Sequence, residues 1–348
     1  MRKLKRELNI GGVKIGGENP VAIQSMCNTD TRNVKETVSQ ILRLEDAGCE
    51  IIRVAIPDME AAQAVSEIKK QIHIPLVVDI HFDYRLALEC MKNGADKVRI
   101  NPGNIGSKER VRQVVDMAKS GGIPIRIGVN GGSLDKELLK KYNGVTAEAL
   151  VESAMSHVEI LDELNFFDVA VSIKVSDVPT TIAAYRKFNE VSDIPLHIGV
   201  TEAGTLRSGT IKSAIGIGTL LAEGIGDTMR VSLTADPIEE IYAAYDIQKM
   251  LGMRKQGVNL VSCPTCGRTQ INLIALAEEV EKRLAGLDKP IKVAVMGCAV
   301  NGPGEAREAD IGIAGGNGEG LIFAKGEIIR KVSEDKIVEE LMKEIEKL

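Results

Sequence analysis

KVRINPG, residues 97–103, joins a short β-favouring run to a charged side chain and a turn, and this pattern recurs along the chain. Eight such runs occur at intervals of roughly 30 residues, and the segments between them have the periodicity of amphipathic helices. The runs are VAIQSM (21–26), EIIRVAI (50–56), PLVVDIHF (75–82), KVRINPG (97–103), IPIRIGVN (123–130), FDVAVSIKVS (167–176), PLHIGVTEAG (195–204) and TMRVSLTA (228–235). Eight strand–helix units in about 250 residues predict an α/β fold, the (β/α)8 or TIM barrel.

The chain changes character after the eighth run. Asp236, Pro237 and Glu239 in TADPIEE form a strong helix start, and this helix is expected to close the barrel near Met253. From about Val258 the pattern changes to a helix, INLIALAEEVEKRLAGL (271–287), flanked by two strand-like runs, VNLVSCP (258–264) and KVAVMGC (292–298). The segments ADIGIAG (309–315) and GLIFAKGEIIRKV (320–332) and a charged terminal helix follow. We therefore predict a barrel over residues 1–257 and a small α/β domain over residues 258–348.

Composition excludes several classes of function. The basic start MRKLKRELNIGG lacks the apolar run of a signal peptide, and no stretch has the length of a membrane span. We expect a cytoplasmic protein without membrane contact. The net charge of −5 and the absence of Trp argue against a nucleic-acid surface, which needs a basic face and stacking rings.

The predicted carboxyl ends of the barrel strands carry an excess of positive charge. Side chains two apart on a strand share a face, and five strands then present a cation to the mouth, namely Arg53, Arg99, Arg126, Lys174 and Arg230. Only two carboxylates, Asp79 and Glu202, are expected nearby. At about 5 Å and an effective dielectric constant of about 20, each pair of like charges costs roughly 3 kcal/mol.

This excess predicts an anionic ligand, although single arginines at strand ends are often structural ion pairs. The planar fork of Arg suits phosphate oxygens, so a diphosphate or phosphate ester is the preferred ligand class. Other polar side chains at the mouth are His81, Asn101, Asn130, Ser172, Ser176, His197 and Ser232. The glycine-rich SGTIKSAIGIG (208–218) lies where such barrels often bind phosphate, but its glycines could serve turns alone.

Three of the six cysteines lie at turns of the small domain. Cys263 and Cys266 form CPTC, and Cys298 follows after KVAVMG. This spacing leaves zinc, iron–sulfur and redox use open, but no His lies in the domain to complete a zinc site. Glu305 is the nearest oxygen donor, unless it only caps a helix or stays solvated. Cys49 and Cys90 are expected to be buried packing residues, and Cys27 stays unassigned.

Motifs along the whole chain resemble the bacterial 4-hydroxy-3-methylbut-2-enyl diphosphate synthases of the methylerythritol phosphate pathway. They are QSMCNTDT (24–31), DIHFDYRLAL (79–88), RINPGNIG (99–106), IRIGVNGGSL (125–134), SIKVSD (172–177), HIGVTEAG (197–204), SCPTCGRT (262–269) and GCAVNGPGEA (297–306). The resemblance implies a TIM barrel with a 4Fe-4S domain. Such an enzyme reductively opens 2-C-methyl-D-erythritol 2,4-cyclodiphosphate to the linear allylic diphosphate and water, with electrons from flavodoxin or ferredoxin.

The resemblance also implies roles for residues that match its motifs. The cluster ligands would be Cys263, Cys266, Cys298 and Glu305. The diphosphate would be held by Arg53, Arg99, Arg126 and Lys174, with further polar contacts from Asn130, Ser232 and Ser262. Glu202 would be the acid that helps the hydroxyl leave as water, and Glu305 is the second residue expected to take part in catalysis. Asp79 and His81 match a motif without an assigned role.

The order of the two domains poses a geometric problem. A helix of about 17 residues after the eighth strand runs roughly 25 Å from the catalytic face to the opposite face, where the thiol domain begins. A head-to-tail homodimer, in which each thiol domain covers the partner barrel, would solve this problem, with a hinge near Gly257. The family resemblance implies the same arrangement.

Two rival interpretations stay open. One is a barrel enzyme for a phosphorylated or pterin substrate with a zinc-binding accessory domain. The other is a binding protein whose cluster senses the redox state.

Overall fold

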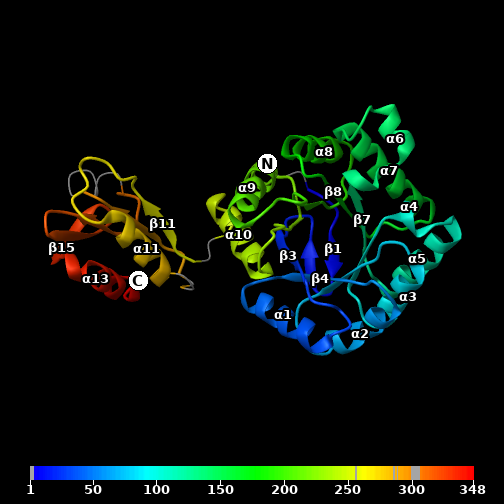
Figure 1. The fold of residues 1–348 in the computed structure, drawn as a ribbon, viewed down its shortest axis with the longest axis horizontal. Helices are drawn as coiled ribbons and strands as arrows, with labels where there is room; N and C mark the ends of the chain where they lie inside the picture. Colours follow the sequence, from blue (N-terminus) through cyan, green and yellow to red (C-terminus); the bar gives the residue numbers. More distant parts are fainter. Residues whose placement is uncertain (1–3, 255–256, 285–286, 288, 299–305) are drawn as a thin grey trace. The chain divides into compact units, whose positions relative to one another are not determined.

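The computed structural model describes residues 4–254, 257–284, 287, 289–298 and 306–348. The chain forms two compact units, Met1–Leu251 and Gly252–Leu348 (Figure 1).

The first unit is built on eight parallel strands in the order β8-β7-β6-β5-β4-β3-β10-β9. A parallel bridge between Val171 and Leu196 joins the two edges and nearly closes the barrel. The strands are β3 (Ala22–Met26), β4 (Ile51–Ala55), β5 (Leu76–Asp79), β6 (Lys97–Ile100), β7 (Ile125–Asn130), β8 (Val169–Lys174), β9 (His197–Ile198) and β10 (Thr228–Met229). The predicted TIM barrel is confirmed, although β9 and β10 are shorter than their sequence runs.

Helices surround this sheet (Figure 1). They are α1 (Val34–Asp46), α2 (Met59–Lys69), α3 (Tyr84–Lys92), α4 (Pro102–Ile105), α5 (Lys108–Gly121), α6 (Lys136–Lys141), α7 (Ala147–Glu163), α8 (Val178–Val191), α9 (Leu206–Ala222) and α10 (Pro237–Met250). Several begin at an Asp whose side chain accepts a hydrogen bond from the first turn, as at Asp58 and Asp177. The predicted start of α10 is confirmed, with Asp236 as its N-cap, and the helix ends at Met250 rather than near Met253.

Strand alternation separates an apolar layer from a polar lumen. Side chains such as Ile23, Val54 and Val98 point toward the helices and belong to the main core. Their neighbours along each strand therefore face the lumen. The amino-terminal end of the lumen is closed by a hairpin of β1 (Leu8–Ile10) and β2 (Val13–Ile15), which the sequence analysis did not predict. Its apolar side chains pack on the first residues of the strands, including Ala22 and Ile51.

The second unit contains a five-stranded mixed sheet in the order β11-β12-β13-β14-β15. Its strands are β11 (Asn259–Ser262), β12 (Lys292–Met296), β13 (Ile311–Gly315), β14 (Glu319–Ala324) and β15 (Glu327–Ser333). The first three strands are parallel, and the last two pairings are antiparallel. Helices α11 (Leu273–Leu284) and α13 (Ile337–Glu346) pack on one shared apolar core with this sheet. The predicted small α/β domain is confirmed.

Within the described ranges, no helix combines the length and the apolar character that crossing a membrane requires.

Candidate functional site

Four of the predicted cations face the barrel lumen. We call Arg53, Arg99, Arg126 and Lys174 the mouth cations. Their strand neighbours Val54, Val98 and Ile127 lie in the outer apolar core, so the cations point inward. Arg99, Arg126 and Lys174 are buried, and Arg53 is nearly so. Positive charge is thus concentrated in a space with little access to water.

Asp79 compensates two of these charges. Arg99 Nη1 donates to Asp79 Oδ1 at 2.8 Å, and Arg53 Nη1 lies 3.4 Å from Asp79 Oδ2. Burial alone would raise the pKa of Asp79, but the two guanidinium groups outweigh it and lower the pKa to about 2. Asp79, whose role the sequence left open, therefore fixes the positions of both arginines.

Arg126 and Lys174 have no such partner: neither forms an ion pair with any side chain in the described ranges. Arg126 Nη1 donates to the neutral Gln24 Oε1 at 3.0 Å. Burial lowers the pKa of Lys174 well below its ordinary value, and the charges of Arg126 and Arg53 lower it further. Because a buried cation without a counterion is costly, this arrangement favours an anionic ligand.

Two glycines make room for the mouth cations. A Cβ atom at Gly128 would collide with the guanidinium of Arg99. At Gly199, a Cβ would lie 2.8 Å from Lys174 Nζ. These glycines, in IRIGVN and HIGVTEAG, therefore allow the long side chains to cross the lumen.

The structure corrects three details of the predicted mouth. Arg230 is not free, because its Nε lies 3.2 Å from Oε2 of Glu240 on α10. Lys97, two residues before Arg99, is a further buried lumen cation that the sequence analysis missed. The glycine-rich residues 208–218 lie inside α9 and do not form a phosphate loop. Gly209 and Gly216 in this helix leave space for Leu233 and Val200.

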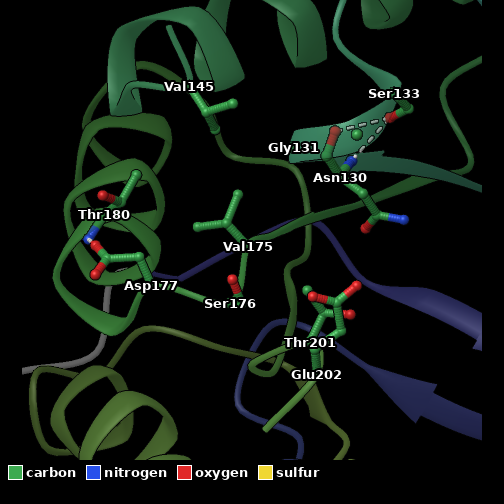
Figure 2. Close-up of a pocket in the computed structure, with 11 residues that line it drawn as sticks. Asn130, Gly131, Ser133, Val145, Val175, Ser176, Asp177, Thr180, Thr201 and Glu202 are labelled. Carbon is green, nitrogen blue, oxygen red and sulfur yellow. Dashed lines mark hydrogen bonds between the residues drawn. The ribbon is translucent and has the colours of Figure 1, made fainter.

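A cavity of about 530 Å³ lies where the loops after β7, β8 and β9 meet. Asn130 and Glu202 line it from different loops, together with Ser176 and Thr201 (Figure 2). Asn130 pairs in register with Lys174, so the cavity adjoins the mouth cations. Glu202 is exposed and has a left-handed φ of 51°. A non-glycine residue rarely adopts this conformation, which often marks a functional position.

The remaining polar residues of the mouth divide into two groups. Asn101 caps α4, where its Oδ1 accepts from Gly103 N at 3.1 Å. His197 is buried and bonds through Nδ1 to Thr228 Oγ1 at 2.8 Å. Ser232 is half-buried after β10, and His81 is exposed after β5. Asn101 and His197 are thus engaged within the barrel, whereas Ser232 and His81 are accessible.

The second unit brings two thiols to one edge of its sheet. Cys263 follows β11 and Cys298 follows β12, and these parallel strands pair with Ser262 opposite Val295. Gly297 N donates to Cys263 Sγ at 3.2 Å, and Gln270 N donates to Gly297 O at 3.1 Å. The CPTC loop is therefore tied to the chain next to Cys298. The hydroxyl of the exposed Ser262 donates to Cys263 O at 3.4 Å.

The chemistry of these thiols suits a thiophilic metal. Hydrogen bonds from the backbone and then the side chain of Arg268 lower the pKa of Cys266, which favours its thiolate. The described residues alone do not form a cluster of three or more metal-ligating side chains, and Glu305 lies outside them. Cys27, Cys49 and Cys90 are buried in the barrel, and burial raises the pKa of each to about 12. The packing role predicted for Cys49 and Cys90 is confirmed.

Two profile matches cover most of the chain. The GcpE TIM-barrel domain matches residues 5–245, and the GcpE protein C-terminal domain matches residues 259–347. A relative from Caldanaerobacter subterraneus is 62% identical, over 100% of this chain and 98% of its own length. A relative from Clostridium acetobutylicum is also 62% identical, over 99% of this chain and 98% of its own. Both are named 4-hydroxy-3-methylbut-2-en-1-yl diphosphate synthase (flavodoxin).

Among solved structures, a dihydropteroate synthase from Stenotrophomonas maltophilia aligns with a TM-score of 0.51 and 12% identity. The alignment covers 71% of this chain and 97% of that chain. At this identity the likeness shows the barrel fold alone. The profiles and the names of the relatives confirm the resemblance inferred from the motifs: the chain belongs to the GcpE family.

Proposed function

We propose that the chain is an iron–sulfur oxidoreductase that converts 2-C-methyl-D-erythritol 2,4-cyclodiphosphate to 4-hydroxy-3-methylbut-2-enyl diphosphate. The reaction takes up two electrons and two protons, opens the ring at a C–O bond and releases one water. The observation that carries this proposal is that the buried Arg126 and Lys174 form no ion pair among the described residues, in a family whose relatives bear this enzyme's name.

The mouth cations would hold the diphosphate. Arg53 and Arg99, oriented by Asp79, offer planar forks that match phosphate oxygens, and Arg126 and Lys174 form no ion pair among the described residues and would add their charge. Asn130 and Ser232 would add polar contacts at the rim, and Ser262 of the second unit would add another. When the C–O bond breaks, the same charges would stabilise the departing diphosphate oxygen.

Glu202 would supply a proton to the hydroxyl that leaves as water. It lines the same cavity as Asn130, next to the mouth cations, and its exposure allows it to regain a proton from solvent. Its left-handed backbone is a rare conformation that functional positions often adopt.

Cys263, Cys266 and Cys298 would hold a 4Fe-4S cluster, with Glu305 as the fourth ligand, in a domain of residues 258–348. When bound, such a cluster supplies electrons one at a time to a C–O bond. The thiolate-favouring surroundings of Cys266 and the amide donated to Cys263 suit this role. The names of the relatives favour flavodoxin over ferredoxin as the electron donor.

A homodimer would bring the two sites together. Helix α10 has 14 residues, so it carries the chain about 21 Å from the mouth toward the opposite face of the barrel. The second unit of one copy would then cover the mouth of the other. If so, a Cys263→Ser chain and a Glu202→Gln chain, each inactive alone, regain activity when they exchange subunits. No recovery after demonstrated exchange would exclude cross-chain assembly.

The proposal is tested by anaerobic reconstitution with iron and sulfide, followed by an assay with the cyclic diphosphate and reduced flavodoxin. We expect the linear diphosphate from the wild-type chain. Arg126→Met should keep its cluster but lose diphosphate binding, and Cys263→Ser should show the reverse. About one zinc per chain without sulfide, or a full cluster without product, would contradict the proposal.

A further inference from the structure

The lower part of the barrel lumen contains a group of buried nitrogen atoms without hydrogen-bond partners. Within the described part of the chain, none of these atoms has a hydrogen-bond partner. We call their four side chains the inner donor cluster: Gln24 (Nε2), Lys97 (Nζ), Arg126 (Nε) and His197 (Nε2). Each side chain is at most 1% exposed. Native proteins rarely leave a buried donor unsatisfied, so four in one lumen need an explanation.

The members of the inner donor cluster share one space. They come from β3, β6, β7 and β9, and strand alternation directs each of them into the lumen. Arg126 on β7 reaches Gln24 on β3 across the barrel, with Nη1 3.0 Å from Oε1. The charge of Arg126 acts on both Lys97 and His197. The four groups therefore line the same lumen, and two of them are in direct contact.

The inner donor cluster lies between an apolar hairpin at the amino-terminal end of the lumen and the charged residues of the mouth. Below, the hairpin of β1 and β2 packs apolar side chains against Ile51 and Val77. Above, Asp79 is already occupied by Arg53 and Arg99. The side chains of this hairpin cluster are apolar, and Asp79 is engaged with the mouth. A ligand in between must be small.

The hydrogen-bonding groups of the inner donor cluster favour an anion over a water molecule. The Gln24 oxygen already accepts from Arg126, and Nδ1 of His197 is engaged with the Thr228 hydroxyl. In the tautomer whose Nδ1 accepts from that hydroxyl, Nε2–H is a donor, and all four free groups can then donate. A water molecule would accept at most two of these bonds and would still need acceptors for its own hydrogens. An anion accepts from all of them and compensates the charge of Arg126 and Lys97.

We propose that the inner donor cluster binds a small inorganic anion of halide size in the lower lumen. This site lies below the diphosphate site and does not depend on the proposed function. Its anion would support Arg126 from beneath, on the Nε side, while the guanidinium serves the mouth. The matched probe is bromide, which has the charge and size of the proposed ligand and can be located by anomalous scattering.

The test is a crystal of the full wild-type chain grown in sodium bromide, with diffraction data at the bromine absorption edge. We expect an anomalous peak within hydrogen-bonding distance of Lys97 Nζ and Gln24 Nε2. Water alone at this position, or bromide only on the surface, would overturn the proposal. This experiment needs no variant, so it stays decisive even if a substitution prevents folding.

A solution measurement follows the same site. Thermal unfolding of the barrel is compared in chloride and in gluconate, which is too large for the lumen, at equal ionic strength. We expect chloride to raise the melting temperature by about 3 °C once it exceeds its dissociation constant several-fold. Lys97→Met should remove this difference, and Lys108→Met, at a side chain that is 80% exposed, should keep it. Equal halide dependence of the wild type and Lys97→Met would contradict the site.

Discussion

The substitution Gly128→Ala probes the mouth without removing any charged group. Gly128 lies on β7, and an added Cβ would lie 2.7 Å from Nη2 and 2.9 Å from Cζ of Arg99. The side chain of Arg99 is only 10% exposed, and its Nη1 is bound to Asp79 at 2.8 Å. The guanidinium must therefore move away from Asp79 and from the expected diphosphate position.

The size of the effect follows from the bond that is lost. A hydrogen bond to a charged group contributes about 1.5–3 kcal/mol. If the displaced Arg99 loses one such bond to the diphosphate, the dissociation constant rises roughly tenfold to a hundredfold, since each 1.4 kcal/mol corresponds to about tenfold. Overpacking of the lumen should also lower the free energy of unfolding by about 1–3 kcal/mol.

Binding is measured by isothermal titration of the cyclic diphosphate into the Gly128→Ala chain, with unfolding in denaturant measured in parallel. The matched control is Gly218→Ala on α9, where the nearest atom to an added Cβ is 3.9 Å away. The control should bind like the wild type. Unchanged binding by Gly128→Ala would refute the inference that Arg99 at this position grips the diphosphate.

Three further predictions concern the protons and charges of the mouth. The pKa of Lys174 is lowered in the free chain, and a bound diphosphate should raise it again, so binding at a pH above the lowered pKa should take up a proton. Affinity should then fall as pH rises between the lowered pKa and the ordinary value of 10.5, and titration in buffers of different ionisation enthalpy should detect an uptake that Lys174→Met reduces. Asp79→Asn should cost about 3–5 kcal/mol of unfolding free energy at neutral pH, because it leaves two guanidinium groups without their buried partner. The contribution of Asp79 to the free energy of unfolding should be complete above pH 3.8 and lost as the pH falls toward 2. A series of unfolding measurements in acid that lacks this loss would contradict the ion-pair argument. Glu202→Gln should lower turnover roughly 10²–10⁴-fold in a steady-state assay while diphosphate affinity stays within about twofold. A large loss of affinity would instead make Glu202 a binding residue.

The barrel could be predicted because its eight strands share one local pattern. In each run the apolar residues face the helices, so the residues that alternate with them, such as Arg53 and Arg126, face the lumen. The hairpin of β1 and β2 was missed because each strand has only three residues. Glu240 was missed because an acid in the first turn of a helix is ordinarily interpreted as part of its cap.

The lower lumen was missed for a different reason. Sequence reasoning looked for functional groups at the carboxyl ends of the strands, where barrel active sites lie. Lys97 is the first residue of β6, and Gln24 lies in the middle of β3, so neither met this criterion. Extending the alternation down each strand would have found both. The thiols were found because their spacing is local, whereas their meeting at adjacent strand ends depends on the pairing of β11 with β12.

A single-turnover experiment tests the central claim most directly, namely that electrons from an iron–sulfur cluster reach an anion held by the barrel. The reconstituted chain is reduced and mixed anaerobically with the cyclic diphosphate and one further electron equivalent of reduced flavodoxin, because one cluster gives up one electron and the reaction takes up two. Cluster absorbance and product are then followed together. We predict reoxidation of the cluster with one linear diphosphate formed for every two electrons withdrawn. A cluster that stays reduced while the diphosphate is bound and unchanged would contradict the account.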